Sequence, residues 1–295
     1  MGKKGKKAQA GKPKKLTPKD IGKRLNVLVK KVEEELEGAD LLAPLPPVDD
    51  CAICLVPLPR ASEEIVKFYQ ACCGNEICKA CKMENKTSVN KQNEKKSAGK
   101  KLALTCPFCR EPEPATDQEN FCRLQARCLQ NDHMAFTLVG DVYQKGKCDL
   151  GIAVDDLKAL DCWIQAVEHG SPVACTCIAT CYKDGDGVSV DKERAALFER
   201  VGALRGDVVA RHNIGCSEYL SGNHEIGIRH WKISAEAGYQ KSLDALRGTY
   251  NANGEMPGKE FISDEEMDTI YRSGHEAQME IKTEEREKHS SVKSA

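Results

Sequence analysis

Apolar residues recur at helical spacing through most of the second half of the chain. One example is the run Leu157, Leu160, Ile164 and Val167. Steps of three and four residues place such side chains on one face of a helix. The stretch from 116 to 255 therefore predicts a series of amphipathic helices.

The helical region also repeats itself. The pattern of small residues and tyrosine in 135–146 returns in 174–185, and weaker copies begin at Ala210 and Ser242. A second segment alternates with the first, and its copies end at Gly170, Gly206 and Gly238. The steps between these glycines, 36 and 32 residues, are typical of helix-hairpin solenoids. We expect the glycines to end helices in the left-handed conformation and the hairpins to stack into a curved array.

Two further helices are expected near the ends of the chain. Residues 17–46 predict an amphipathic helix and a proline-rich linker, with Pro18 at the first helical position and the prolines from 44 to 47 ending the helix. Its apolar stripe consists of Ile21, Leu25, Leu28, Val32 and Leu36. The stripe is expected to pack against the cysteine-rich region or against a second copy of the chain. Residues 256–295 predict an acidic helix over 264–288 that caps the solenoid, followed by a frayed tip.

The composition suits a mainly α protein of about two domains. The 295 residues carry a net charge of −1, and 40% are hydrophobic while only 5% are aromatic. There is no apolar run of about 18 residues and no secretory signal, so we expect an intracellular protein, cytoplasmic or nuclear, without a membrane partner. Residues 1–16 form a lysine-rich tail. We expect this tail to be disordered and solvated rather than to bind nucleic acid, because it lacks aromatic residues and a folded recognition element.

The cysteines change this picture, because eight of the sixteen lie between Cys51 and Cys109 and no histidine occurs before His133. They form four pairs: Cys51 and Cys54, Cys72 and Cys73, Cys78 and Cys81, Cys106 and Cys109. Clustered thiols in a reducing compartment bind metal more often than they form disulfides. A CxxC pair presents two thiolates to one tetrahedral zinc ion. Eight thiols in this window therefore predict two zinc ions.

Three short motifs carry a resemblance to a known family. Cys-Ala-Ile-Cys at 51–54, Cys-Cys-Gly-Asn-Glu-Ile-Cys-Lys-Ala-Cys at 72–81 and Cys-Pro-Phe-Cys-Arg at 106–110 resemble a RING finger spanning residues 47–115. The resemblance implies a cross-brace in which alternate pairs share a zinc ion. The implied first site is Cys51, Cys54, Cys78 and Cys81, and the implied second site is Cys72, Cys73, Cys106 and Cys109. Asn75 stands where that family usually has histidine, so the chain resembles the all-cysteine variant.

The RING resemblance also implies a function without a catalytic nucleophile of its own. Such a module docks a ubiquitin-conjugating enzyme and holds its ubiquitin thioester in a reactive pose. The implied docking residues are Ile53, Pro107 and Arg110, although Ile53 is also a candidate packing residue and Arg110 a candidate solvated charge. The polar stretch 82–105 has only Met83 and Val89 as large apolar candidates for the docking face, and we expect a flexible loop from Lys91 to Lys101.

The repeats carry a second resemblance. Lys-Ala-Leu-x2-Trp-x2-Ala at 158–166 resembles the SEL-one-like repeat, a relative of the tetratricopeptide repeat that serves as a protein-binding scaffold. We expect Trp163 and Trp231 to bury their rings between neighbouring hairpins. Cys175, Cys177 and Cys181 are expected to pack in the core, and the acidic segment 184–187 is expected to form a turn between helices.

Together these features predict a small zinc-bound RING module followed by an α-α hairpin solenoid. The function expected from them is a RING-type ubiquitin ligase whose repeats bind a substrate or partner protein. A non-catalytic zinc-binding scaffold is the alternative, favoured by the polar 82–105 stretch. The sequence leaves open whether enzymatic activity is present.

Overall fold

The computed structural model describes residues 16–58, 60, 67–94, 102–251 and 260–279. The lysine-rich tail up to residue 15 and the tip from 280 onward lie outside these residues. The elements, in chain order, are α1 Pro18–Leu36, β1 Lys67–Tyr69, β2 Glu76–Cys78, α2 Lys79–Glu94, α3 Asp117–Cys128, α4 His133–Lys145, the 3-10 turn η1 Cys148–Leu150, α5 Asp156–Glu168, α6 Pro172–Asp184, α7 Lys192–Leu204, α8 Val208–Leu220, α9 His224–Glu236, α10 Gln240–Asn251 and α11 Asp264–Met279. The fold is mainly α, as predicted.

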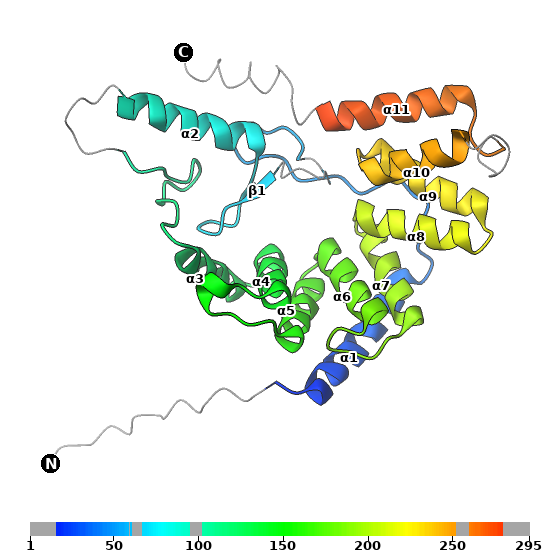
Figure 1. Ribbon diagram of the computed structural model, residues 1–295, viewed down its shortest axis with the longest axis horizontal. Helices are drawn as coiled ribbons and strands as arrows, with labels where there is room; N and C mark the ends of the chain where they lie inside the picture. Colours follow the sequence, from blue (N-terminus) through cyan, green and yellow to red (C-terminus); the bar gives the residue numbers. More distant parts are fainter. Residues whose placement is uncertain (1–15, 59, 61–66, 95–101, 252–259, 280–295) are drawn as a thin grey trace.

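The repeats form an arc of stacked helical hairpins, which Figure 1 shows running from α3 to α11. The six helices from α4 to α9 each have 13 residues. They pair closely as α4 with α5, α6 with α7, and α8 with α9. The predicted curved array of hairpins is therefore confirmed.

Capping residues explain where these helices begin and end. The side chains of Asp132, Ser171 and Asp207 accept backbone N–H groups at the starts of α4, α6 and α8, which satisfies donors that a helix leaves unpaired. Gly170 and Gly206 follow α5 and α7 with φ of 93° and 99°. Left-handed glycines thus terminate the second helix of a repeat, as predicted.

The two tryptophans are buried, as predicted. Trp163 on α5 shares an apolar cluster with side chains of α6 and α7, and Trp231 on α9 shares one with side chains of α10 and α11. Each ring also lies over a glycine on the paired helix of its own hairpin. A Cβ atom on Gly140 would lie 2.5 Å from Trp163 Nε1, and one on Gly215 would lie 2.5 Å from Trp231 Cδ1. Each indole ring therefore fills the space that the missing side chain leaves.

Helix α1 packs on the outside of the arc, against α5 and α7. Ile21, Leu25, Leu28 and Val32 are all buried in the core that these helices share. This corrects the expectation that the stripe covers the cysteine-rich region or a second copy of the chain. The helix also ends at Leu36, before the prolines.

The last helix, α11, covers the end of the arc beside α9 and α10. Met267 and Ile270 on α11 are buried together with Trp231 and Leu246 in one apolar cluster. The helix is described as far as Met279, and the remainder of the predicted 264–288 helix lies outside the described residues. Within those residues, α11 occupies the capping position that its amphipathic pattern predicts.

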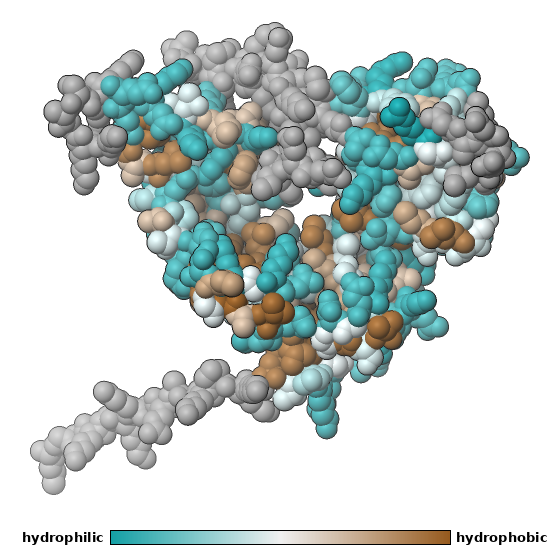
Figure 2. Space-filling view, viewed as in Figure 1, coloured by the Kyte–Doolittle hydropathy of each residue, from teal (hydrophilic) through white to brown (hydrophobic). Residues whose placement is uncertain are grey.

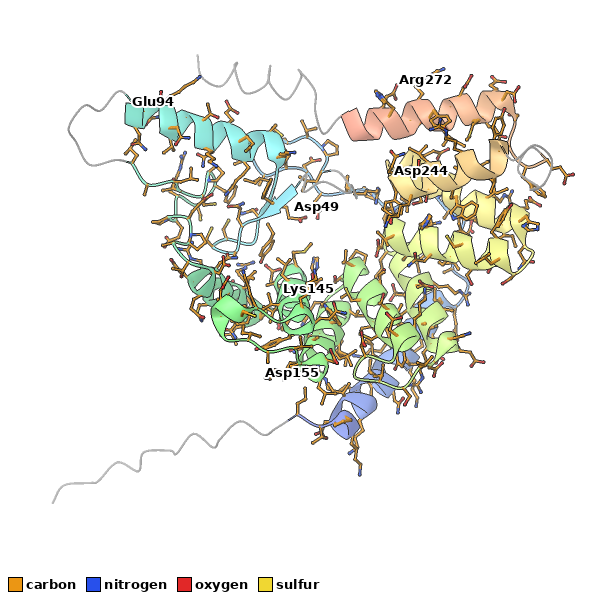
Figure 3. The ribbon with its side chains drawn as sticks, in the orientation of Figure 1. Asp49, Glu94, Lys145, Asp155, Asp244 and Arg272 are labelled. Carbon is orange, nitrogen blue, oxygen red and sulfur yellow. The ribbon has the colours of Figure 1, made fainter. Side chains whose placement is uncertain are left out.

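Residues 47–115, called the cysteine module below, contain two short antiparallel strands and α2. Helix α2 runs to Glu94, which is labelled at its far end in Figure 3, so the expected loop from Lys91 is wrong for 91–94, and 95–101 lie outside the described residues. The chain that returns beside α2 is hydrogen-bonded to the helix. Asn85 Nδ2 donates to the carbonyl of Thr105 over 2.8 Å, and the Asn93 amide bonds to both backbone groups of Leu102.

Candidate metal centre

The eight predicted ligands form two compact clusters. The first cluster contains Cys51, Cys54, Cys78 and Cys81, and the second contains Cys72, Cys73, Cys106 and Cys109. Within each cluster the four sulfur atoms lie within 4.8 Å of one another. These are the two sets that the RING resemblance implies, and all sixteen cysteines of the chain are free thiols.

The first and last CxxC turns close in the same way. The backbone N–H of Leu55 donates to the carbonyl of Cys51 over 2.9 Å, and that of Arg110 donates to the carbonyl of Cys106 over 3.0 Å. Leu55 and Arg110 have φ of 57° and 68°, a left-handed conformation that costs a non-glycine residue roughly 1–2 kcal/mol. The two turns therefore share one tight geometry that points both thiols of a pair toward one position.

The other two pairs come from the centre of the module. Cys78 ends β2 and Cys81 lies in the first turn of α2, so the strand-to-helix junction sets their separation. Cys72 and Cys73 lie in the turn between the strands, which is closed by a hydrogen bond from the Gln70 N–H to the Asn75 carbonyl. The pairing of Phe68 with Ile77 holds the strands in register and so places the two clusters side by side.

Close contacts and burial shift the pKa of several thiols in the two clusters. A hydrogen bond with Cys78 is the largest of the effects that hold the pKa of Cys51 far below its ordinary value, whereas contact with Cys51 raises the pKa of Cys81. Burial opposes ionisation of Cys106, but N–H donors in its own turn outweigh burial and lower its pKa. Burial raises the pKa of Cys72. The thiols of each cluster thus interact closely with one another, and a bound metal ion would displace their protons.

The sulfur positions fit zinc. Tetrahedral zinc with thiolates at about 2.3 Å places neighbouring sulfur atoms about 3.8 Å apart. The Cys54 and Cys78 sulfurs are 3.9 Å apart, as are those of Cys73 and Cys106. Four thiolates and no carboxylate form the donor set that selects zinc over magnesium or calcium. Each cluster could therefore hold one metal ion such as zinc.

Asn75 is close to the second cluster without belonging to it. Its Nδ2 donates to Cys73 Sγ over 3.3 Å. An N–H donor of this kind stabilises a metal-bound thiolate and orients it. Asn75 therefore has a supporting role that the sequence reasoning did not assign.

The three predicted docking residues differ in their exposure to solvent. Ile53 is half-buried and packs against the apolar residues around the first cluster, Pro107 is half-buried, and Arg110 is exposed. Two apolar side chains that the sequence reasoning missed are more open: Leu55 is 69% exposed and Phe108 is 51% exposed. Their signal was an apolar residue inside or just after a CxxC turn, outside any helical periodicity.

The cysteines of α6 and the acidic segment that follows them lie where the sequence predicted. Cys175 and Cys181 on α6 are buried in the core, with Cys177 packed beside them, which confirms the packing prediction. Helix α6 ends at Asp184, and Gly185 follows with φ of 87°, so this segment is the predicted turn.

Comparison with known proteins leaves the family open. No family model matches the chain, and no curated protein matches it significantly. Among solved structures, a Sel1 repeat protein from Oxalobacter formigenes superposes with a TM-score of 0.46 and 25% identity, over 55% of this chain and 65% of its own. A protective antigen of uropathogenic Escherichia coli that displays an SLR fold gives a TM-score of 0.44 and 20% identity, over 59% of this chain and 37% of its own.

In both comparisons the match spans less than two thirds of the other protein. The hairpin architecture of this chain is seen directly in the pairing of its own helices. Among the described residues, no helix is both long and apolar enough to cross a membrane.

Proposed function

We propose that this chain is a RING-type ubiquitin ligase, in which the cysteine module recruits a ubiquitin-conjugating enzyme and the repeats bind a substrate or partner protein. The observation that carries the proposal is the interleaving of two four-thiol clusters. The first and third cysteine pairs along the chain meet in one cluster, and the second and fourth pairs meet in the other. A cross-brace of this kind is what the RING resemblance implies.

The module would act by position rather than by covalent chemistry. Zinc, when bound, supplies the cross-links that fold the module. Leu55 and Phe108 offer exposed apolar surface on the first and last CxxC turns, and Arg110 offers a guanidinium that can donate two parallel hydrogen bonds. Holding the thioester and the acceptor amine in one pose lowers the entropic cost of transfer.

The repeats support a partner-binding role next to the module. A cavity of about 440 Å³ lies between the module and the first helices of the arc. Its wall is largely apolar and includes Tyr69 and Ala71 from the module, Leu124 from α3, and Leu138 and Val142 from α4. Pockets of this size and character bind apolar side chains, so a partner held there would lie against the cysteine module.

A non-catalytic scaffold remains the second candidate. Ile53 is half-buried against the apolar residues of the module itself, and α2 has only Cys81 buried along its 16 residues. Figure 2 shows a face that is mainly hydrophilic, with scattered apolar patches. These features suit a zinc module that only supports the fold.

Discharge of ubiquitin from a preloaded conjugating enzyme onto free lysine tests the proposal. Wild-type protein should accelerate discharge with at least one enzyme of a panel. Phe108→Ala and Ile53→Ala should weaken binding of the enzyme, because they remove apolar contact area. Arg110→Ala should slow discharge while leaving binding nearly intact, because its role is orientation.

Metal content measured by native mass spectrometry is the control, since none of the three substitutions removes a thiol. If wild-type protein accelerates discharge with no enzyme of the panel, the scaffold is favoured. If discharge is accelerated but all three variants match wild type, the ligase proposal stands and the docking residues are wrong.

A further inference from the structure

The second cluster is linked to the repeats by a joint of four residues, Tyr69, Gly74, Arg127 and Asp132, called the Asp132 joint below. The Tyr69 hydroxyl donates to Asp132 Oδ2 over 2.7 Å. Arg127 donates to the same oxygen from Nε over 3.0 Å and from Nη2 over 2.7 Å. The other carboxylate oxygen of Asp132 accepts the backbone N–H groups of Met134 and Ala135 at the start of α4.

The joint reaches the metal-binding turn through Gly74. This residue directly follows Cys72 and Cys73 and has φ of 79°. A Cβ atom on Gly74 would clash with the Arg127 guanidinium and would lie 2.9 Å from Asp132 Oδ2. The backbone of the cysteine turn therefore rests directly on the ion pair at the start of α4.

The turn formed by residues 70–75 is short, so a displacement of its two thiols would also displace the Asp132 joint. Gln70 N–H donates to the Asn75 carbonyl over 2.8 Å, and Gly74 N–H donates to the Gln70 carbonyl over 2.7 Å. Ala71, between Tyr69 and Cys72, is buried against Phe121 and Leu124 of α3. The six residues from 70 to 75 thus hold two thiols on one side and the repeats on the other.

The first cluster faces the repeats more loosely: Leu58 beside it borders a cavity whose wall includes His133 and Met134 of α4. Its apolar neighbours, Leu58, Phe68 and Ile77 among them, all belong to the cysteine module. The first cluster also buries three of its four cysteines, whereas the second leaves Cys109 exposed. A chelator should therefore reach the second cluster first and leave the first as an internal reference.

We propose that Arg127 and Asp132 are positioning residues for the second cluster, so that a metal ion bound there and docking of the cysteine module on the repeats stabilise each other. The inference rests on metal binding, as proposed above, and not on ubiquitin transfer. Linkage requires reciprocity: if metal favours docking by some factor, docking favours metal by the same factor.

The first arm of the test measures metal release from the full chain. The protein is incubated with a chelator and pulsed with N-ethylmaleimide, and peptide mass spectrometry reports which cysteines become labelled. Tyr69→Phe and Arg127→Gln should speed labelling of Cys106 and Cys109 at least about five-fold, with labelling of Cys51 and Cys54 unchanged.

Tyr143→Phe and Arg229→Gln are the matched controls for that arm. Tyr143 packs against Phe121 in the same apolar cluster, and Arg229 lies on α9 and pairs with Glu225. Neither residue belongs to the Asp132 joint, so both variants should release metal at the wild-type rate. Equal acceleration of both clusters by the joint variants, or none, would overturn the inference.

The second arm measures docking by hydrogen exchange. When only the second metal has been removed, amides at the start of α4 should exchange faster, and those of α8 should not change. Unchanged exchange at α4 in this one-metal state would also overturn the inference. A protein that binds no metal overturns the inference together with the metal site, whereas coupling without ubiquitin discharge overturns only the ligase proposal.

Discussion

Single side chains decide the chemistry of this chain. Among the residues that the structure describes, the thiols of the two clusters are the groups placed to bind metal directly, while Asn75 touches one of them through its Nδ2. Deep in the repeats, His230 is buried with Nδ1 unpaired, beside Arg211 and near Glu218. These residues give two predictions at this scale.

The first compares Cys72 with Asn75. Cys72→Ser should release the second metal and unfold much of the module, because structural zinc contributes on the order of 10 kcal/mol or more to folding. The Asn75→Ala variant should keep both metal ions, since it loses only a hydrogen bond to the Cys73 sulfur. The metal ion of the second cluster should exchange with solution faster than in wild type. Native mass spectrometry reads both results. Loss of metal on changing Asn75 but not Cys72 would show that the ligand set is wrong.

The second concerns pH. Burial, with Arg211 nearby, lowers the pKa of His230 from 6.5 to about 4. Between these two pH values His230 is protonated in the unfolded chain but not in the folded chain. This residue therefore lowers the free energy of unfolding as pH falls below 6.5 and has no effect above pH 6.5. The loss by pH 4 is about 3 kcal/mol. Urea unfolding of wild type and His230→Gln at pH 7 and pH 4.5 should show a smaller decrease for the variant; equal decreases would contradict the assignment.

At the scale of elements, close helix contact depends on matched pairs of residues. Trp163 and Trp231 each sit over a glycine of the paired helix. The middle hairpin lacks both partners: Ala179 stands in the glycine position, and Glu199 stands in the tryptophan position, where it is buried and paired with Lys183. The repeat thus tolerates a change on one helix when the facing helix changes with it.

A substitution of glycine tests this matching. Gly140→Ala should destabilise the protein by about 1–3 kcal/mol, because the new methyl group meets the Trp163 ring. Gly248→Ala in α10, where a Cβ would meet nothing within 4 Å, should instead stabilise by up to about 1 kcal/mol. Trp163→Ala should cost about 3–5 kcal/mol, and Gly140→Ala should add little to it. Additive costs in the double variant, measured by denaturant unfolding, would argue against direct packing.

At the scale of the whole molecule, the N-terminal segment from α1 to Asp49 packs along the outside of the helical arc. Helix α1 buries its stripe on α5 and α7, and the chain then runs past α8, where the buried Arg211 donates to the carbonyl of Leu41. It enters the cysteine module near Asp49, which Figure 3 labels between the module and the arc. The first cysteine cluster and the main body of the repeats nevertheless have separate apolar cores, while Ala71 of the module joins the apolar cluster of α3 and α4.

Separate cores predict a two-part response to metal removal. Native protein should carry two zinc ions. Prolonged chelation should unfold the module, because its small core depends on bound metal, while most helical signal in circular dichroism should persist, because the apolar core of the repeats contains no metal ligand. Fewer than two metals, or complete loss of helix on chelation, would contradict this division.

The sequence alone determined the local features of this protein. Helical spacing located the repeats, glycines marked helix ends and short cysteine spacings marked the ligand pairs, because each of these signals lies within a few residues. The RING resemblance implied which pairs meet. Only the tertiary structure decided what lies against what. The α1 stripe lies against the repeats, the tryptophans fill the space beside glycines of the paired helices, and Asn85 and Asn93 of α2 bind the returning chain. The Asp132 joint joins residues 63 apart, and no local pattern reveals a contact between such distant positions.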